Sequence, residues 1–153
     1  MLERGQKRKN NKVEALSNHL RNRQEGIQRI LEWLATESAN GTPIVVEGKK
    51  DIEALRELGV EGKIISAKTG GKSRLDLICE IEKIGVKEVI LLFDFDRRGK
   101  EWTEILKQQL EKVRIKPNLT FWKKLLRFAG RDIKDIEGLT ACMRTLRKKI
   151  GED

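Results

Sequence analysis

Short apolar segments rich in β-branched residues alternate with longer segments of helical periodicity through the middle of the chain. The apolar segments are PIVVEG at 43–48, KIIS at 63–66 and the run from Glu88 to Phe93. Strands that alternate with helices in this way are typical of a parallel sheet covered by helices on both faces. The sequence therefore predicts an α/β fold, with a sheet of about four strands if NLTF at 118–121 supplies the fourth.

Helices are predicted before, between and after these strands, because apolar residues recur there at helical spacing. The longest predicted helix spans residues 12–38 and ends at Asn40-Gly41. The first ten residues are expected to be loose. The chain of 153 residues is the size of one domain. The remaining predicted helices are at residues 50–58, 74–84, 99–113, 122–129 and 133–150.

Charged residues are distributed unevenly along the chain, whose formal net charge is +9. Residues 1–40 carry a net charge of +3, residues 41–106 carry −1, and residues 107–153 carry +7. The acids thus gather in the middle of the chain, between basic flanks. Flanks that bind a polyanion and a metal-binding centre would give this pattern. The alternative is a generic basic surface that has no nucleic-acid partner.

Two of the predicted strands end in carboxylates. Glu47 follows IVV, and Asp94 and Asp96 follow ILLF. Because the carboxyl ends of parallel strands lie at one edge of a sheet, these three acids can converge there if the strands are neighbours. Clustered carboxylates repel one another unless a cation or a proton lies among them. Mg²⁺, or Mn²⁺ in its place, is the expected ion, because it prefers oxygen ligands. Taken singly, each acid is more simply a helix cap.

A known family carries the same pair of motifs. EGKKDIEAL at 47–55 followed by LLFDFDRRGKE at 91–101 resembles the signature of the Toprim domain, a glutamate after the first strand and Asp-x-Asp after a later one. That domain occurs in topoisomerases, bacterial primases and some nucleases. In topoisomerases another acid usually follows two residues on, where this chain has Arg98. The chain looks most similar to small, stand-alone archaeal Toprim proteins, which are similar to the bacterial nuclease that matures 5S ribosomal RNA.

The resemblance implies an α/β Toprim domain at residues 42–122, between a basic N-terminal helix at 1–41 and a basic helical extension at 123–153, in one compact unit. It also implies catalytic and metal-binding roles for the three acids. The expected function is Mg²⁺-dependent phosphodiester chemistry on nucleic acid, with RNA rather than DNA as partner. A small endoribonuclease that matures ribosomal RNA is the first hypothesis. The alternative is a non-catalytic module that binds RNA or the ribosome.

Other chemistries of the family are excluded or weakly supported by the residues present. The chain has no tyrosine, so it cannot form the tyrosyl–DNA intermediate of a topoisomerase. Two cysteines and one histidine are too few for the zinc module of a bacterial primase. SAKTGGKS at 66–73 approaches a phosphate-binding loop, but Ser66 replaces its first glycine. An NTPase and a primase-related nucleotidyl transferase are therefore the weaker alternatives.

Charged residues close to the three acids are further candidates for the site. Arg binds phosphate with two nitrogens and Lys acts as a point charge, so the neighbouring cations are candidate phosphate ligands. Asp51 either supports the metal site from the second shell of residues or only begins a helix. The acids in RDIKDIEG at 131–138 are interpreted as a solvated helix start, with an auxiliary metal site as the alternative. These acids are Asp132, Asp135 and Glu137, and the candidate phosphate-binding residues are Lys49, Lys50, Lys72, Arg97 and Arg98.

The sequence gives no sign of a membrane partner. No apolar run approaches the roughly 20 residues of a membrane span, and the N-terminus lacks the apolar segment of a secretory signal. A cytoplasmic protein is therefore expected. The long helix at 12–38 can pack on its own domain or on a second copy, which makes a homodimer possible. Trp102 and Trp122 are expected to pack in the core rather than to stack on bases.

Overall fold

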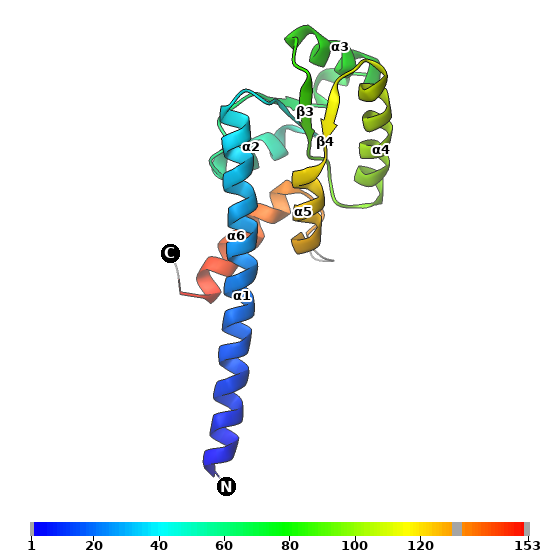
Figure 1. Cartoon of the computed structure of the whole chain (residues 1–153). Helices are drawn as coiled ribbons and strands as arrows, with labels where there is room; N and C mark the ends of the chain where they lie inside the picture. Colours follow the sequence, from blue (N-terminus) through cyan, green and yellow to red (C-terminus); the bar gives the residue numbers. More distant parts are fainter. Residues whose placement is uncertain (1, 130–132, 152–153) are drawn as a thin grey trace.

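Four short strands form one parallel sheet in the computed structural model (Figure 1), which describes residues 2–129 and 133–151. The strands are β1 (Ile44–Val46), β2 (Ile64–Ser66), β3 (Glu88–Leu91) and β4 (Lys116–Asn118). Their order in the sheet is β2-β1-β3-β4, and every neighbouring pair is parallel. Ile44 of β1 pairs with Ile64 on one side and with Ile90 on the other. The predicted α/β fold with a four-stranded parallel sheet is confirmed.

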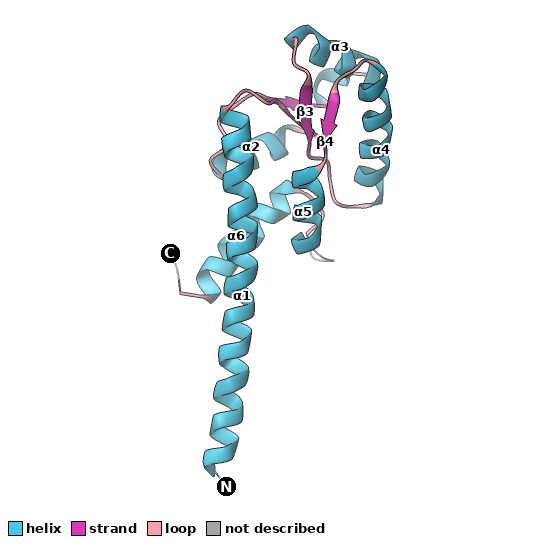
Figure 2. Cartoon of the chain, in the orientation of Figure 1, coloured by secondary structure: helices cyan, strands magenta, loops and turns pink. Residues whose placement is uncertain are grey.

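Helices cover both faces of this sheet. They are α1 (Leu2–Ala39), α2 (Lys49–Glu57), the 3₁₀ turn η1 (Thr69–Gly71), α3 (Arg74–Ile84), α4 (Arg97–Lys112), α5 (Thr120–Ala129) and α6 (Ile136–Lys149). Ile44 and Val46 pack in one apolar cluster with α1, α2, α5 and α6, whereas Val45 packs in a second cluster with α3 and α4. This alternation follows from the period of two of a strand. Figure 2 shows the small sheet between these two groups of helices.

The fourth strand lies earlier in the chain than the sequence predicted. It spans residues 116–118 rather than 118–121, and it includes Pro117. Proline cannot donate a ladder hydrogen bond, and β4 tolerates it because this edge strand pairs only with β3. Asn118 ends the strand, because its side-chain oxygen accepts a hydrogen bond from the backbone N–H of Thr120, where α5 begins.

Helix α1 is longer than predicted and has two different halves. It begins at Leu2, so the expectation that the first ten residues are loose was wrong; Gln, Lys and Arg there are good helix formers. Ile27, Leu31 and Leu34 are buried in the core. The N-terminal half extends beyond the rest of the molecule (Figure 1), and its Val13 is 67% exposed. Within the described residues, no helix is long and apolar enough to cross a membrane.

Candidate functional site

The carboxyl ends of the two central strands place Glu47 and Asp94 side by side. Glu47 follows β1 by one residue, and Asp94 follows β3 by three. Strands β1 and β3 are hydrogen-bonded neighbours and run parallel, so both residues lie at the same edge of the sheet. This edge is where parallel α/β sheets bind their ligands.

Glu47 is a buried carboxylate with one satisfied and one unsatisfied oxygen. The residue is 8% exposed. Its Oε2 accepts a hydrogen bond from Lys68 Nζ at 3.3 Å, which is also an ion pair. Its Oε1 is buried and has no hydrogen-bond donor among the described residues. Burying a carboxylate oxygen without a donor costs free energy, so a cation or a proton beside this atom would stabilise it.

The carboxyl group of Asp94, beside Glu47, also favours a nearby proton or cation. Burial is the main reason why its pKa is raised, to about 8, and hydrogen-bond contact with the Glu47 carboxyl is the next. The negative charges of Glu47, Asp51 and Asp135 raise it further. Two carboxyl groups in contact can share a proton, or a cation can replace that proton and let both ionise. Such a pair can take up either a proton or a divalent cation.

The backbone around Asp94 is held by close packing and by hydrogen bonds. A Cβ atom at Gly99 would collide with the carbonyl oxygen of Asp94, so only glycine lets α4 approach this closely. Trp122 is buried, as predicted, and its indole N–H donates to the carbonyl oxygen of Phe93 at 3.0 Å. The N–H of Phe95 donates to the carbonyl oxygen of Lys134 at 2.6 Å. These contacts fix the direction in which Asp94 leaves the sheet.

Asp96 lies outside the cleft that contains Glu47 and Asp94. It is exposed and caps α4, since its Oδ1 accepts a hydrogen bond from the N–H of Gly99 at 2.8 Å. Among the residues that the structure describes, no three acidic, histidine or cysteine side chains are close enough together to hold a metal ion. The arrangement is thus a pair of carboxylates, with the third expected acid used as a helix cap.

Acids from other segments surround this pair. Asp51 is buried; its Oδ2 accepts a hydrogen bond from the N–H of Gly48 at 3.1 Å. Burial first, and then the charges of Asp135, Glu47 and Glu137, raise the pKa of Asp51. Asp135 caps α6 through the N–H of Gly138, as a helix start would, yet both Asp135 and Glu137 line the cleft. Asp132 lies outside the described residues.

The cleft has a volume of about 290 Å³ and carries cations beside its acids. Lys49 and Lys50 are exposed at its rim, where α2 begins. Lys68, just after β2, is a cation that the sequence reasoning did not select. The residues that line the cleft are Glu47, Gly48, Lys49, Lys50, Asp51, Lys68, Asp94, Asp135 and Glu137.

The other candidate phosphate ligands do not line the cleft. Lys72 donates to Glu80 at 2.7 Å and to the carbonyl oxygen of Ser66 at 2.8 Å, which holds its ammonium against α3. Arg97 is exposed and pairs with Glu101, also on α4, at 3.3 Å. Arg98 is exposed on the same helix. The structure thus divides the five candidates into two at the cleft and three outside it.

Comparison with known proteins shows the family of this chain. The model of the Toprim domain matches residues 42–122. The chain belongs to the Toprim family. UPF0292 proteins are similar to it over most of its length: one from Methanosarcina barkeri is 35% identical over 131 residues, which cover 86% of this chain and 90% of the relative. Another, from Methanocaldococcus jannaschii, is 40% identical over 116 residues, which cover 75% and 88%.

A solved structure supports the same assignment. A protein from Aquifex aeolicus superposes with a TM-score of 0.61 at 28% sequence identity, covering 71% of this chain and 94% of that one. The resemblance to archaeal Toprim proteins that the sequence suggested is therefore confirmed. Toprim domains in general bind divalent metals such as Mg²⁺ and interact with nucleic acid.

Lys68 is the charged residue of the cleft that the sequence reasoning missed, whereas Asp135 and Glu137 were considered only as an alternative, auxiliary site. Asp135 and Glu137 follow the matched segment, and their loop reaches the sheet edge through contacts distant in sequence, such as the hydrogen bond from the N–H of Phe95 to the carbonyl oxygen of Lys134. No local pattern in the sequence records that contact. Lys68 had a usable signal, because it follows the strand at 64–66 and so lies at the same edge as Glu47.

Proposed function

We propose that this Toprim protein holds Mg²⁺ between Glu47 and Asp94 and hydrolyses phosphodiester bonds in nucleic acid, as a small endoribonuclease that acts on structured RNA such as an rRNA precursor. The observation that carries the proposal is the pair of carboxyl groups: Glu47, which has one buried oxygen without a donor among the described residues, and its neighbour Asp94, whose pKa is raised to about 8. Mn²⁺ has the same ligand preference and is the expected substitute.

Glu47 and Asp94 fit such an ion, because carboxylate oxygens are hard ligands and one buried oxygen of Glu47 has no hydrogen-bond donor among the described residues. When bound, the ion would supply charge stabilisation at a phosphate oxygen. Lys68 holds one oxygen of Glu47 and leaves the other free to accept a ligand or a proton. Glu47 is therefore also the candidate general base. Asp51 stabilises the turn between β1 and α2, because its carboxylate accepts a hydrogen bond from the N–H of Gly48.

The cations around the cleft support a phosphate-bearing substrate. Lys49 and Lys50 lie at its rim, and in this proposal they bind phosphates of the substrate backbone. The basic flanks add charge beyond the Toprim domain, with +3 over residues 1–41 and +4 over residues 123–153. Such charge binds the backbone and the shape of a folded RNA more than its sequence. We propose that residues 1–41, 42–122 and 123–153 act as one unit in this binding.

A non-catalytic RNA- or ribosome-binding module is the second candidate, and one observation favours it. Asp96 is occupied as the cap of α4, so the cleft has fewer carboxylates directly beside Asp94 than the motif would provide. A phosphate-binding role needs no third ligand. The NTPase and nucleotidyl-transfer alternatives gain no support, because Lys72 of the glycine loop is bound to Glu80 and Ser66.

The test is a cleavage assay with labelled structured RNA and with duplex DNA, in Mg²⁺, Mn²⁺ or a chelator. The variants are Glu47→Gln and Asp94→Asn, and Glu53→Gln is the matched control on the exposed side of α2. Metal-dependent products that disappear in both site variants and persist in the control would support the nuclease. Tight RNA binding without products in either metal would favour the binding module. Equal cleavage by all variants would exclude the site.

A further inference from the structure

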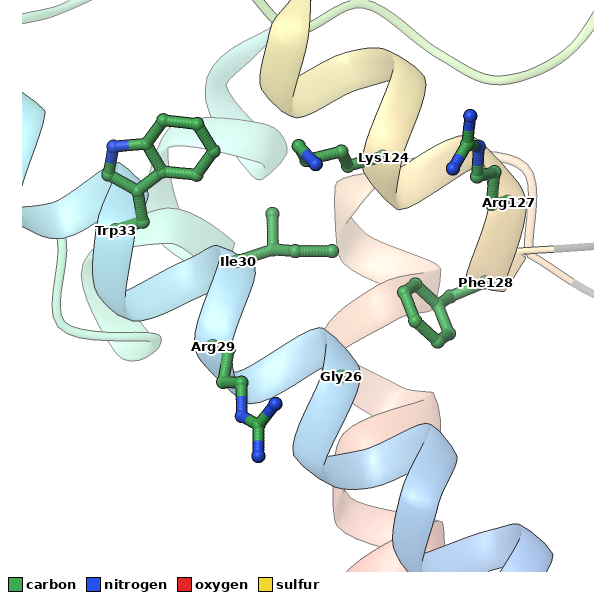
Figure 3. A pocket seen from close by; sticks show the side chains of 7 residues that line it. All are labelled: Gly26, Arg29, Ile30, Trp33, Lys124, Arg127 and Phe128. Atoms are coloured by element: carbon green, nitrogen blue, oxygen red, sulfur yellow. The ribbon is translucent and has the colours of Figure 1, made fainter.

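A second cavity lies between α1 and α5, outside the main body of the Toprim domain. It has a volume of about 340 Å³. Gly26, Arg29, Ile30 and Trp33 of α1 line one side, and Lys124, Arg127 and Phe128 of α5 line the other (Figure 3). The volume is at the low end of the range of about 300–1,000 Å³ for small-ligand pockets, so it suits a single nucleotide unit better than a larger group.

The aromatic and apolar residues of this α1–α5 pocket are held in place by the packing of the two helices. Trp33 is 43% exposed, and its ring contacts Phe121 edge-on at a centroid distance of 4.6 Å, which fixes its orientation. A Cβ atom at Gly26 would collide with the ring of Phe128, so this glycine permits the close helix contact. Arg23 donates to the carbonyl oxygen of Phe128 at 2.8 and 3.2 Å and ties the end of α5 to α1.

The charged residues of the pocket are all cations. Arg29, Lys124 and Arg127 make no ion pair within the described part of the chain, and the described lining residues include no carboxylate. Lys124 Nζ lies 5.9 Å from the centroid of the Trp33 ring. Figure 3 shows Trp33 and Phe128 at opposite ends, Ile30 between them, and Lys124 and Arg127 along the α5 side. An anion attached to a flat apolar group satisfies both sets of residues.

We propose that the α1–α5 pocket binds an unpaired nucleotide of a single-stranded segment of nucleic acid. The base stacks on the exposed indole of Trp33, since base–aromatic stacking tolerates any base. The adjoining phosphates contact Lys124, which lies beside that ring, and Arg127, which lies farther along α5 (Figure 3). An acidic peptide would satisfy the cations but would leave the flat face of Trp33 without a planar partner. The pocket binds its ligand whether or not the acidic cleft cleaves RNA.

The test measures the binding of short labelled oligouridylate and oligothymidylate by fluorescence anisotropy in a chelator, so that no metal-dependent cleavage occurs. Trp33→Leu keeps an apolar side chain but removes the stacking face, and it should weaken binding about tenfold. Trp33→Phe keeps a ring and should recover most of the affinity. Lys124→Gln with Arg127→Gln should weaken binding and lower its salt dependence. Circular dichroism establishes that each variant is folded.

A matched charge control is Lys83→Gln with Lys112→Gln, two exposed lysines on α3 and α4. It removes the same charge as the pocket variant and should leave binding close to that of the native protein. Equal binding of RNA and DNA, or a preference for RNA, supports the proposal when Trp33→Leu weakens it. Unchanged affinity in Trp33→Leu, or equal losses in the two charge variants, would overturn it. Glu47→Gln should bind the oligonucleotide with the affinity of the native protein. A failure of the nuclease hypothesis would therefore appear in cleavage assays and not in this binding assay.

Discussion

The acidic cleft and the α1–α5 pocket have similar volumes, about 290 and 340 Å³, and opposite character. The cleft collects five carboxylates and three lysines at the edge of the sheet, whereas the pocket collects three cations and an exposed tryptophan between two helices. A phosphate can enter the pocket directly, but the cleft needs a cation first to offset its acids. We infer that the two regions have different roles: the flanking helices α1 and α5 bind a strand of nucleic acid, and the Toprim domain hydrolyses it.

In each region one glycine allows two segments of the chain to approach closely. Replacing these glycines with alanine should give the largest difference between the cleft and the pocket. Gly99→Ala places a Cβ against the backbone of Asp94, which cannot move without moving the strand end. Chemical denaturation should therefore show a loss of about 1–3 kcal/mol, together with a loss of metal-dependent cleavage.

Gly26→Ala meets only the ring of Phe128, a side chain that can turn aside. Its stability should change by less than about 1 kcal/mol, because alanine also favours the helix. It should weaken oligonucleotide binding and leave the hydrolysis of a small phosphodiester unchanged. If Gly26→Ala impaired hydrolysis as much as Gly99→Ala, the two regions would not be separate.

The next largest expected effect is a change of stability with pH, which comes from the titration of Asp94 in the cleft and does not involve the pocket. Its pKa in the native protein is about 8, above the ordinary 3.8, so the native state keeps a proton that the unfolded chain has released between these values. The metal-free protein should lose stability as the pH rises from about 4 to about 8. Asp94→Asn should flatten this part of a plot of Tm against pH in chelator, while Glu53→Gln should not. Parallel curves for Asp94→Asn and the native protein would contradict the account.

A smaller effect separates a capping role of Asp96 from a ligand role. Asparagine caps helices as well as aspartate does, so Asp96→Asn should keep both the stability of α4 and the metal-dependent activity. Asp96→Ala should lower the free energy of unfolding by about 1 kcal/mol. Loss of metal binding in a stable Asp96→Asn variant would show that Asp96 joins the other two acids at the metal, as the sequence motif suggested.

The order of strands and helices was predictable because it depends on local periodicity. Glu47 and Asp94 were also predictable, since each follows an apolar strand and the ends of parallel strands meet. The capping contact of Asp96 was not predictable, because a residue after a strand can line the site or begin the next helix. In this chain its Oδ1 accepts a hydrogen bond from the N–H of Gly99. The approach of Asp135 to the cleft depends on a contact across the chain, between Phe95 and Lys134. The α1–α5 pocket depends on how Gly26 meets Phe128, which periodicity does not record.

The most direct test of the account is the effect of Mg²⁺ on the thermal stability of the native protein, Glu47→Gln and Asp94→Asn, at a pH near 8. An ion that binds only the folded protein stabilises it by about 2.7 kcal/mol at a hundred times its Kd. The account predicts a rise in Tm with Mg²⁺ for the native protein and for Glu53→Gln, and none for the two site variants. An equal rise in Glu47→Gln and Asp94→Asn would mean that the ion binds elsewhere, and would contradict the central claim.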